Sequence, residues 1–98
     1  MAFVTWTPDA LEDLEAICLY IGRSSPAAAV GFANRIFEAT QQLEQFPEMG
    51  RRMPDVLHDD VRVLVLGNYL VAYAVTAEKV EVLAVHHGAR RPDHFELG

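Results

Sequence analysis

The chain has 98 residues, of which 51% are hydrophobic and 22% are charged. This length suits one domain built on a single core, and the composition lies far from the polar, highly charged pattern of disordered chains. The formal net charge of −6 opposes a general nucleic-acid binder, because neutralising phosphates requires a basic surface. No apolar run approaches the roughly 20 residues of a membrane helix, and no basic-then-apolar leader occurs, so we expect a cytoplasmic protein without membrane contact.

The residues that could bind a metal ion do not follow the spacing of a known metal-binding motif. Cys18 is the only cysteine, so a disulfide within the chain is impossible, and we expect Cys18 to be a small core residue. The four histidines form no His-Glu-x-x-His motif, and neighbours such as His86 and His87 would point to opposite faces of a strand. No glycine-rich phosphate loop occurs. We therefore expect neither a metal ion nor a cofactor.

The first part of the chain predicts a strand followed by a helix. Phe3–Trp6 is a short apolar run that fits a strand. Thr7 is a good N-cap residue, and Pro8 suits the first helical position. The helix is expected to run to about Ile21, with Gly22 as its C-terminal cap. Its apolar residues at helical spacing are Leu11, Leu14, Ile17, Cys18 and Ile21.

A second helix is predicted by the same kind of start. Ser25 can cap it and Pro26 can open it. Pro47 disfavours helical structure at Phe46, where we expect the helix to end. The residues expected on its buried face are Val30, Ala33, Ile36, Phe37, Thr40, Leu43 and Phe46. The link between the helices is short, which predicts an antiparallel hairpin, and residues 47–54, interrupted by proline and glycine, are expected to form a loop.

Three strand-like runs fill the second half of the chain. They are residues 62–66, 69–76 and 80–85, rich in β-branched and aromatic side chains. Each of the two connections is short enough for an antiparallel hairpin. The predicted fold is therefore α+β. It consists of an N-terminal strand, an antiparallel two-helix hairpin and a three-stranded antiparallel meander, with the helices packed on one face of the sheet.

Positive charge gathers after residue 50. Residues 1–50 carry two arginines and seven acids (net −5), whereas residues 51–98 carry six basic residues and seven acids (net −1). The arginines of the second half are Arg51, Arg52, Arg62, Arg90 and Arg91. If they converge, they form a positive patch suited to phosphate or carboxylate. If each instead pairs with an acid such as Asp59, Asp60 or Asp93, they form an ordinary solvated surface, and the sequence leaves both interpretations open.

Histidines and aromatic residues offer further candidate sites. His86 or His87 could act as general acid or base near neutral pH, although a structural role at a strand end is favoured for either one alone. Trp6, Tyr69 and Tyr73 could stack on bases. The two tyrosines share one strand face with two valines, however, which favours packing.

Four segments carry the most distinctive pattern of the chain. They are TPDALEDLEAICLYI, the loop FPEMGRR, the run GNYLVAYAV and the ending VEVLAVHHGAR, of which the last two are the more specific. Together they span nearly the whole chain and resemble the RelE/ParE superfamily of toxins from bacterial type II toxin–antitoxin modules. The resemblance implies a strand–helix–helix–meander fold. It also implies a small cognate antitoxin, which folds across the toxin and forms an oligomer with it.

Two activities exist within that superfamily, and two positions of this chain bear on the choice. RelE-like members cleave messenger RNA on the ribosome and are strongly basic, with a cation on the sheet and a tyrosine or histidine near the C-terminus. At the matching positions this chain has Leu70, which cannot stabilise a phosphorane-like charge, and Phe95, which has no hydroxyl. Both argue against a ribosome-dependent endoribonuclease. For that alternative, the catalytic residues would be Arg62, His86, His87 and Arg90.

The ending over residues 87–90 resembles instead the ParE branch, whose members inhibit DNA gyrase by protein–protein contact and have no recognised catalytic residues. The resemblance implies a non-enzymatic toxin of a plasmid-stabilisation module, with DNA gyrase as target and with the ribosome and messenger RNA disfavoured. The residues implied in contacts with target or antitoxin are Arg51, Arg52, Arg62, His87, Arg90 and Arg91. An inactive family member that only binds its antitoxin is the third possibility.

Overall fold

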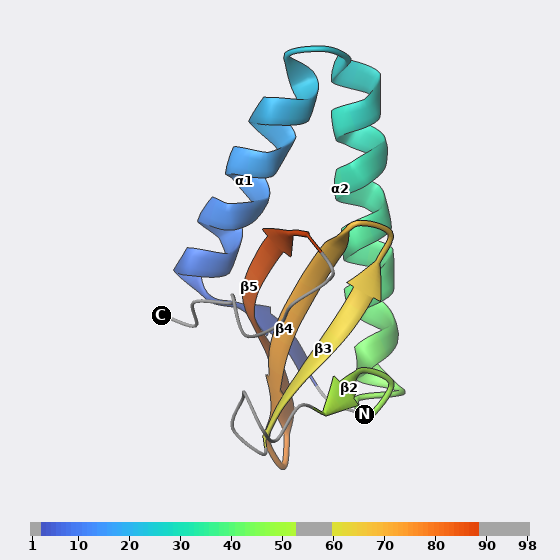
Figure 1. Ribbon diagram of the computed structural model, residues 1–98. Coiled ribbons are helices and arrows are strands. Elements are labelled where there is room, and N and C mark those ends of the chain that lie inside the picture. The colour runs from blue at the N-terminus through green and yellow to red at the C-terminus, as the bar shows by residue number, and fades with distance from the viewer. Residues whose placement is uncertain (1–2, 53–59, 89–98) are drawn as a thin grey trace.

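The computed structural model describes residues 3–52 and 60–88 and confirms the predicted α+β fold (Figure 1). Its elements are β1 (Phe3–Trp6), α1 (Pro8–Gly22), α2 (Pro26–Gln41), the 3₁₀ turn η1 (Gln42–Glu44), β2 (Arg51–Arg52), β3 (Val61–Leu66), β4 (Tyr69–Val75) and β5 (Lys79–His87). None of the helices in this described part of the chain is long and apolar enough to span a membrane.

The strands form one mixed sheet in the order β1-β5-β4-β3-β2. The predicted meander forms its antiparallel centre, while β1 lies parallel to β5, with Phe3 opposite Lys79 and Trp6 opposite Val82. The prediction that residues 47–54 form a loop is wrong at Arg51–Arg52, which form the edge strand β2. A two-residue strand has no periodicity of its own, so only its pairing with β3 reveals it.

Both helices begin where their capping residues predict. The Thr7 side-chain oxygen accepts a hydrogen bond from the Ala10 N–H at 3.1 Å, and Ser25 does the same for Ala28 at 3.1 Å. The prediction that Gly22 is the C-terminal cap is wrong, because Gly22 is the last helical residue and Arg23, which caps the helix, is also helical in φ and ψ. A side chain at Gly22 would lie 3.7 Å from the Ala29 Cβ, so this glycine sits where the two helices approach each other closely.

The second helix differs from its prediction in its end and in its buried face. α2 ends at Gln41 and tightens into η1, several residues before Phe46, as helix C-termini often do. Phe32 is buried, whereas Val30, Phe37 and Phe46, all expected in the core, are exposed. The buried residues of α2 and η1 are Phe32, Ile36, Thr40 and Leu43. This stripe is narrower and rotated from the predicted one, because α2 contacts the sheet on one side and α1 on another.

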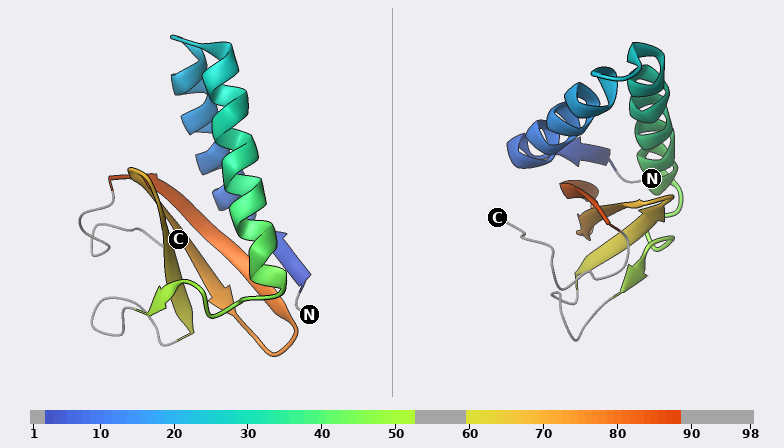
Figure 2. Two further views of the ribbon diagram at one scale, coloured as in Figure 1. Left: turned by 90° about the vertical axis from the view of Figure 1, so that its right-hand side faces the viewer. Right: turned by 45° about the horizontal axis from the view of Figure 1, so that its top comes forward.

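The helical hairpin covers one face of the sheet and projects past the ends of the strands (Figures 1 and 2). We call this side of the sheet the helix face. Its core unites both helices with the sheet through Leu14, Phe32, Ile36, Leu43, Leu64, Val71, Tyr73, Val80, Val82 and Val85. A smaller cluster of Val61, Ala72 and Ala84 lies on the other side, which we call the opposite face.

The last strand is longer than predicted and is secured by α1. β5 continues to His87, so His86 and His87 lie inside the strand and not beyond its end. Pairing with β1 stops at Val82, and the next outward N–H of β5, that of Val85, donates to the Asp13 side chain at 3.0 Å. A side chain of α1 therefore provides the hydrogen-bond acceptor for β5 beyond the point where β1 ends.

Candidate functional site

A buried tyrosine hydroxyl fixes the loop that connects η1 to β2. Tyr73 on β4 is 0% exposed, and its hydroxyl donates to the Pro47 carbonyl at 2.8 Å and accepts from the Gly50 N–H at 2.7 Å. Both capacities of the hydroxyl are thus used by the loop. A Cβ at Gly50 would lie only 2.5 Å from the Tyr73 hydroxyl oxygen, so glycine is needed for this close approach.

A half-buried arginine fixes the same loop from the neighbouring strand. Arg62 lies two residues before Leu64 on β3, so both side chains lie on the helix face. Arg62 is directly opposite Tyr73 in the β3–β4 register. Its Nη1 donates to the Gly50 carbonyl at 2.8 Å and to the Glu48 carbonyl at 3.2 Å. At least one arm of the guanidinium therefore holds backbone and is not presented to a ligand.

The environment of Tyr73 makes the stability of the fold sensitive to alkaline pH. Burial raises the pKa of its hydroxyl, and the smaller opposing influences are the hydrogen bond from Gly50 and the charge of Arg62. In the unfolded chain the phenol titrates near pH 10, roughly its ordinary value. The protonated folded form is therefore fully stabilising below about pH 10, and this contribution is lost as the pH rises through the folded pKa.

We expect the free energy of unfolding to fall more steeply above about pH 10 in the native chain than in Tyr73→Phe, measured by denaturant titration at a series of pH values. The matched control is Tyr20→Phe, which removes an exposed hydroxyl of α1. An identical alkaline fall in native protein and Tyr73→Phe would contradict this assignment.

The five predicted arginines are only partly brought together. Arg52 lies opposite Arg62 in the β2–β3 register and shares its face, whereas Arg51 lies opposite Val63 and points to the other face. Both β2 arginines are exposed. Arg90 and Arg91 lie outside the described residues. Of the three predicted arginines that the structure describes, Arg52 and Arg62 thus lie together on the helix face and Arg51 lies alone on the opposite face.

The two histidines lie on opposite faces of β5. His87 is paired with Tyr69 on the helix face, with ring centroids 4.9 Å apart, and Tyr69 in turn contacts the ring of Phe32 at 4.6 Å. His86 is paired with Leu70 on the opposite face. Leu70 is 2% exposed, so its side chain contributes to packing. Phe95 lies outside the described residues.

The described cations and histidines are far apart on the sheet. Arg62 pairs with Tyr73, while His87 pairs with Tyr69, four residues further along β4. At about 3.3 Å per residue and about 4.8 Å per strand, this places the two backbones roughly 13 Å apart along the strands and roughly 10 Å apart across them. Such a separation does not suit a shared catalytic centre on one phosphate.

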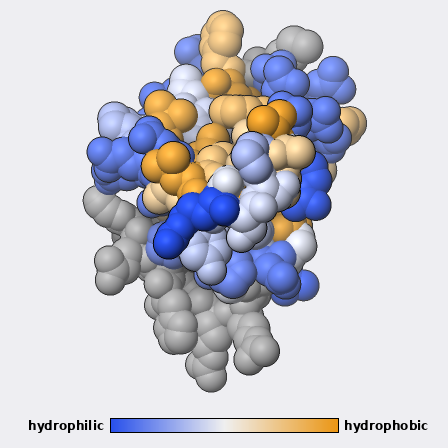
Figure 3. Space-filling view, turned by 90° about the horizontal axis from the view of Figure 1, so that it is seen from above, coloured by the Kyte–Doolittle hydropathy of each residue, from blue (hydrophilic) through white to orange (hydrophobic). Residues whose placement is uncertain are grey.

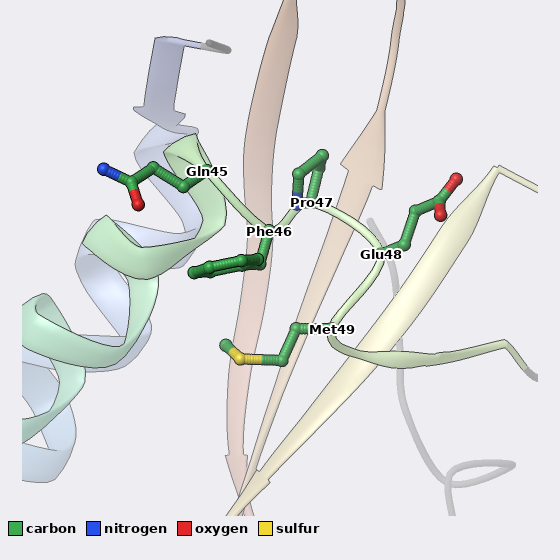
Figure 4. A pocket seen from close by; sticks show the side chains of 5 residues that line it. All are labelled: Gln45, Phe46, Pro47, Glu48 and Met49. Carbon is green, nitrogen blue, oxygen red and sulfur yellow. The ribbon is translucent and has the colours of Figure 1, made fainter.

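The surface beside the fixed loop is hollowed. One hollow of about 460 Å³ is lined by Gln45, Phe46, Pro47, Glu48 and Met49 (Figure 4). A second hollow of about 480 Å³ lies between α2 and the outer part of β3 and is lined by Arg35, Glu38, Ala39, Gln42, Met49, Leu64, Val65, Leu66 and Gly67. Both are lined by Met49. We call them together the α2–β3 groove.

Two exposed apolar residues at this groove do not emerge from the sequence pattern. Helical spacing predicts Phe46 to be buried, yet it is 58% exposed, and Met49, in a predicted loop, is 45% exposed. Their side chains point the same way beside α2, while Glu48 points away from them (Figure 4). The pattern Phe-Pro-x-x-Gly is the one sequence feature that marks this place, since proline and glycine fix the loop that carries both residues.

Comparison with known proteins gives consistent results. Residues 4–92 match the family described as ParE toxin of type II toxin-antitoxin system, parDE. The chain is 39% identical over 90 residues to Toxin RelE2 of Caulobacter vibrioides, covering 92% of this chain and 99% of that protein. A solved structure from the chromosomal ParDE TA system of P. aeruginosa superposes with a TM-score of 0.75 at 25% identity, covering 90% of this chain and 97% of that one.

Proposed function

Because the chain belongs to the ParE toxin family of type II toxin–antitoxin systems, we propose that it is a non-enzymatic toxin that inhibits DNA gyrase in the cytoplasm by protein–protein contact. A cognate antitoxin neutralises it. The module to which it belongs is of the plasmid-stabilisation kind.

The observation that supports a contact mechanism is the placement of the candidate catalytic side chains. Arg62 holds loop carbonyls at one end of the sheet, and His86 and His87 lie on opposite faces at the other end. General acid–base catalysis needs a proton donor and an acceptor within hydrogen-bond reach of one reacting group. Within residues 3–52 and 60–88, these three side chains do not meet that requirement.

The contact surface that we propose retains the residues implied by the family resemblance. They are Arg51, Arg52, Arg62, His87, Arg90 and Arg91. Guanidinium groups suit this role because they bind carboxylates through two parallel hydrogen bonds and remain charged at all physiological pH values. Arg62 contributes indirectly, by holding the loop that leads into β2.

The test uses purified toxin freed of antitoxin. We expect it to inhibit supercoiling by gyrase, to raise the amount of cleaved DNA in gyrase reactions, and to leave transcripts intact in a translation reaction. The paired change Arg90→Ala and Arg91→Ala is expected to raise the half-inhibitory concentration at least about tenfold, the effect of losing about 1.4 kcal/mol of contact energy. The charge-matched control is Arg23→Ala with Lys79→Ala.

Each alternative function has its own outcome in these assays. Cleaved transcripts, lost on alanine substitution at Arg62, His86, His87 and Arg90, would establish a ribosome-dependent endoribonuclease in place of a gyrase inhibitor. Unaffected gyrase together with growth arrest would also refute the proposal. Expression without antitoxin and without any growth defect would identify an inactive family member that only binds its partner.

A further inference from the structure

We propose that the 46–50 loop and the α2–β3 groove form the binding site for a segment of the antitoxin. Phe46 and Met49 are the central apolar contacts of this site. The inference rests on the antitoxin partnership within the proposed function and is independent of gyrase. It assigns a place and a chemistry to that partnership: the segment carries at least one large apolar side chain next to a carboxylate.

The first support is that the loop is fixed before any partner binds. The Tyr73 hydroxyl holds Pro47 and Gly50, and Arg62 holds the carbonyls of Glu48 and Gly50. Four backbone groups of a five-residue loop are therefore tied to two strands of the sheet. A surface ordered in advance loses little conformational entropy on binding, which favours affinity.

The second support is what this fixed loop displays. Phe46 and Met49 are joined by a backbone hydrogen bond from the Met49 N–H to the Phe46 carbonyl at 3.0 Å, and their side chains project together (Figure 4). Both remain largely exposed although the loop itself is rigidly held. Aromatic residues and methionine are enriched in the cores of protein interfaces, so a rigid loop presenting both fits a binding role.

The third support is shape. Met49 lines both hollows, so its exposed side chain stands where they adjoin, with Phe46 lining the first hollow and α2 forming one wall of the second. The far wall is the outer edge of β3, where pairing with β2 ends at Val63. A groove of this kind, with an apolar centre, accommodates a short segment better than it would a flat protein surface.

The fourth support is charge. Arg35 lines the groove, and Arg52 and Arg62 lie on the helix face beside the loop, against Glu38 and Glu48. Three cations against two acids give this region a positive balance on a chain of net charge −6. Such a local balance favours a segment with carboxylates and steers its encounter with the toxin.

A second exposed apolar surface lies on the helical hairpin and lacks these features. Seen from above, apolar residues gather in the middle of this side of the molecule with polar residues around them (Figure 3). On the hairpin, Leu19 is 66% exposed and Val30 is 62% exposed, so both are more exposed than the loop residues. Neither lines either hollow described above. They are therefore the matched control for the proposal.

The test compares two double variants of the full chain. Phe46→Ala with Met49→Ala is expected to weaken binding of purified cognate antitoxin at least about 30-fold, as losses at the centre of an interface do, measured by calorimetry or competition. Leu19→Ala with Val30→Ala is expected to change it less than about threefold. Equal losses in both variants, or a larger loss in the hairpin variant, would overturn the proposal. Gyrase is absent from this assay, so failure of the gyrase mechanism leaves its outcome unaffected.

Tyr73 acts in this proposal as a positioning residue, and its role has a separate readout. Tyr73→Phe is expected to raise the antitoxin dissociation rate at least about fivefold, because most changes at an interface appear in dissociation. Val71→Ala, in the same core cluster, serves as a control for lost stability and is expected to change that rate less than about twofold. If both variants accelerate dissociation in proportion to their loss of melting temperature, the positioning role is refuted.

Discussion

Gly50→Ala is expected to lower the free energy of unfolding by about 3 kcal/mol, the upper part of the range for overpacking a rigid site. The added Cβ would lie 2.5 Å from the Tyr73 hydroxyl oxygen, 2.7 Å from Cε1 and 2.9 Å from Cζ. The ring cannot move aside without cost, because Tyr73 is fully buried in the core. Moving the loop instead breaks the hydrogen bonds that the hydroxyl makes to Pro47 and Gly50. Denaturant unfolding followed by circular dichroism measures the loss.

Another glycine provides the control for this result. Gly31→Ala on α2 places a Cβ where nothing lies within 4 Å, and alanine is favoured over glycine in a helix by up to about 1 kcal/mol. The same substitution is therefore expected to stabilise at position 31 and to destabilise at position 50. Combining Gly50→Ala with Tyr73→Phe should recover part of the loss, because the shortest contact disappears. Gly50→Ala with native stability would show that the loop is not held against Tyr73.

Arg62→Met is expected to destabilise the protein by about 2 kcal/mol, the usual contribution of hydrogen bonds from a charged donor. The methionine keeps most of the apolar stem but leaves the carbonyls of Gly50 and Glu48 without their guanidinium partner. Arg51→Met is the matched control, because no hydrogen bond or ion pair joins the Arg51 side chain to residues 3–52 or 60–88. This control should change the stability by less than about 0.5 kcal/mol.

The Arg62→Met variant also tests what Arg62 does. A positioning role predicts that stability falls first and that antitoxin binding weakens because the loop loses its support. A direct catalytic or contact role predicts instead that Arg62→Met folds with native stability and loses activity alone. That second outcome would contradict the positioning role and assign Arg62 a direct role in contact or catalysis.

The parts of the fold that the sequence predicts depend on short-range chemistry. Thr7 and Ser25 cap helices through N–H groups only three residues away, so both helix starts can be located from the sequence. The two tight turns between β3, β4 and β5 are equally local, and they set the antiparallel pairing of the meander, although the β4–β5 register shifts by one residue between Ala72 and Tyr73. These elements are correctly predicted for that reason.

The candidate site depends on contacts between distant residues and is therefore only partly predictable. Tyr73 meets Gly50 across 23 residues of sequence, and nothing near Gly50 distinguishes it from an ordinary loop glycine. Strand alternation correctly predicts that Tyr73 packs in the core, but it cannot reveal the loop that its hydroxyl holds. The sequence pattern places Phe46 within the helix, on the wrong side of its boundary, because the spacing of apolar residues continues past the true end of α2.

The parallel pairing of β1 with β5 ties the first strand of the described residues to the last, with Thr5 and Val80 adjacent although 75 residues separate them. During synthesis, β1 therefore remains without its neighbour until about 75 further residues have been made. At about 5–20 residues per second, that delay is about 4–15 s. Long-range pairing also slows the folding that follows. We expect the newborn toxin to pass through an interval in which it is synthesised but not yet folded, and in which its binding surfaces are not yet formed.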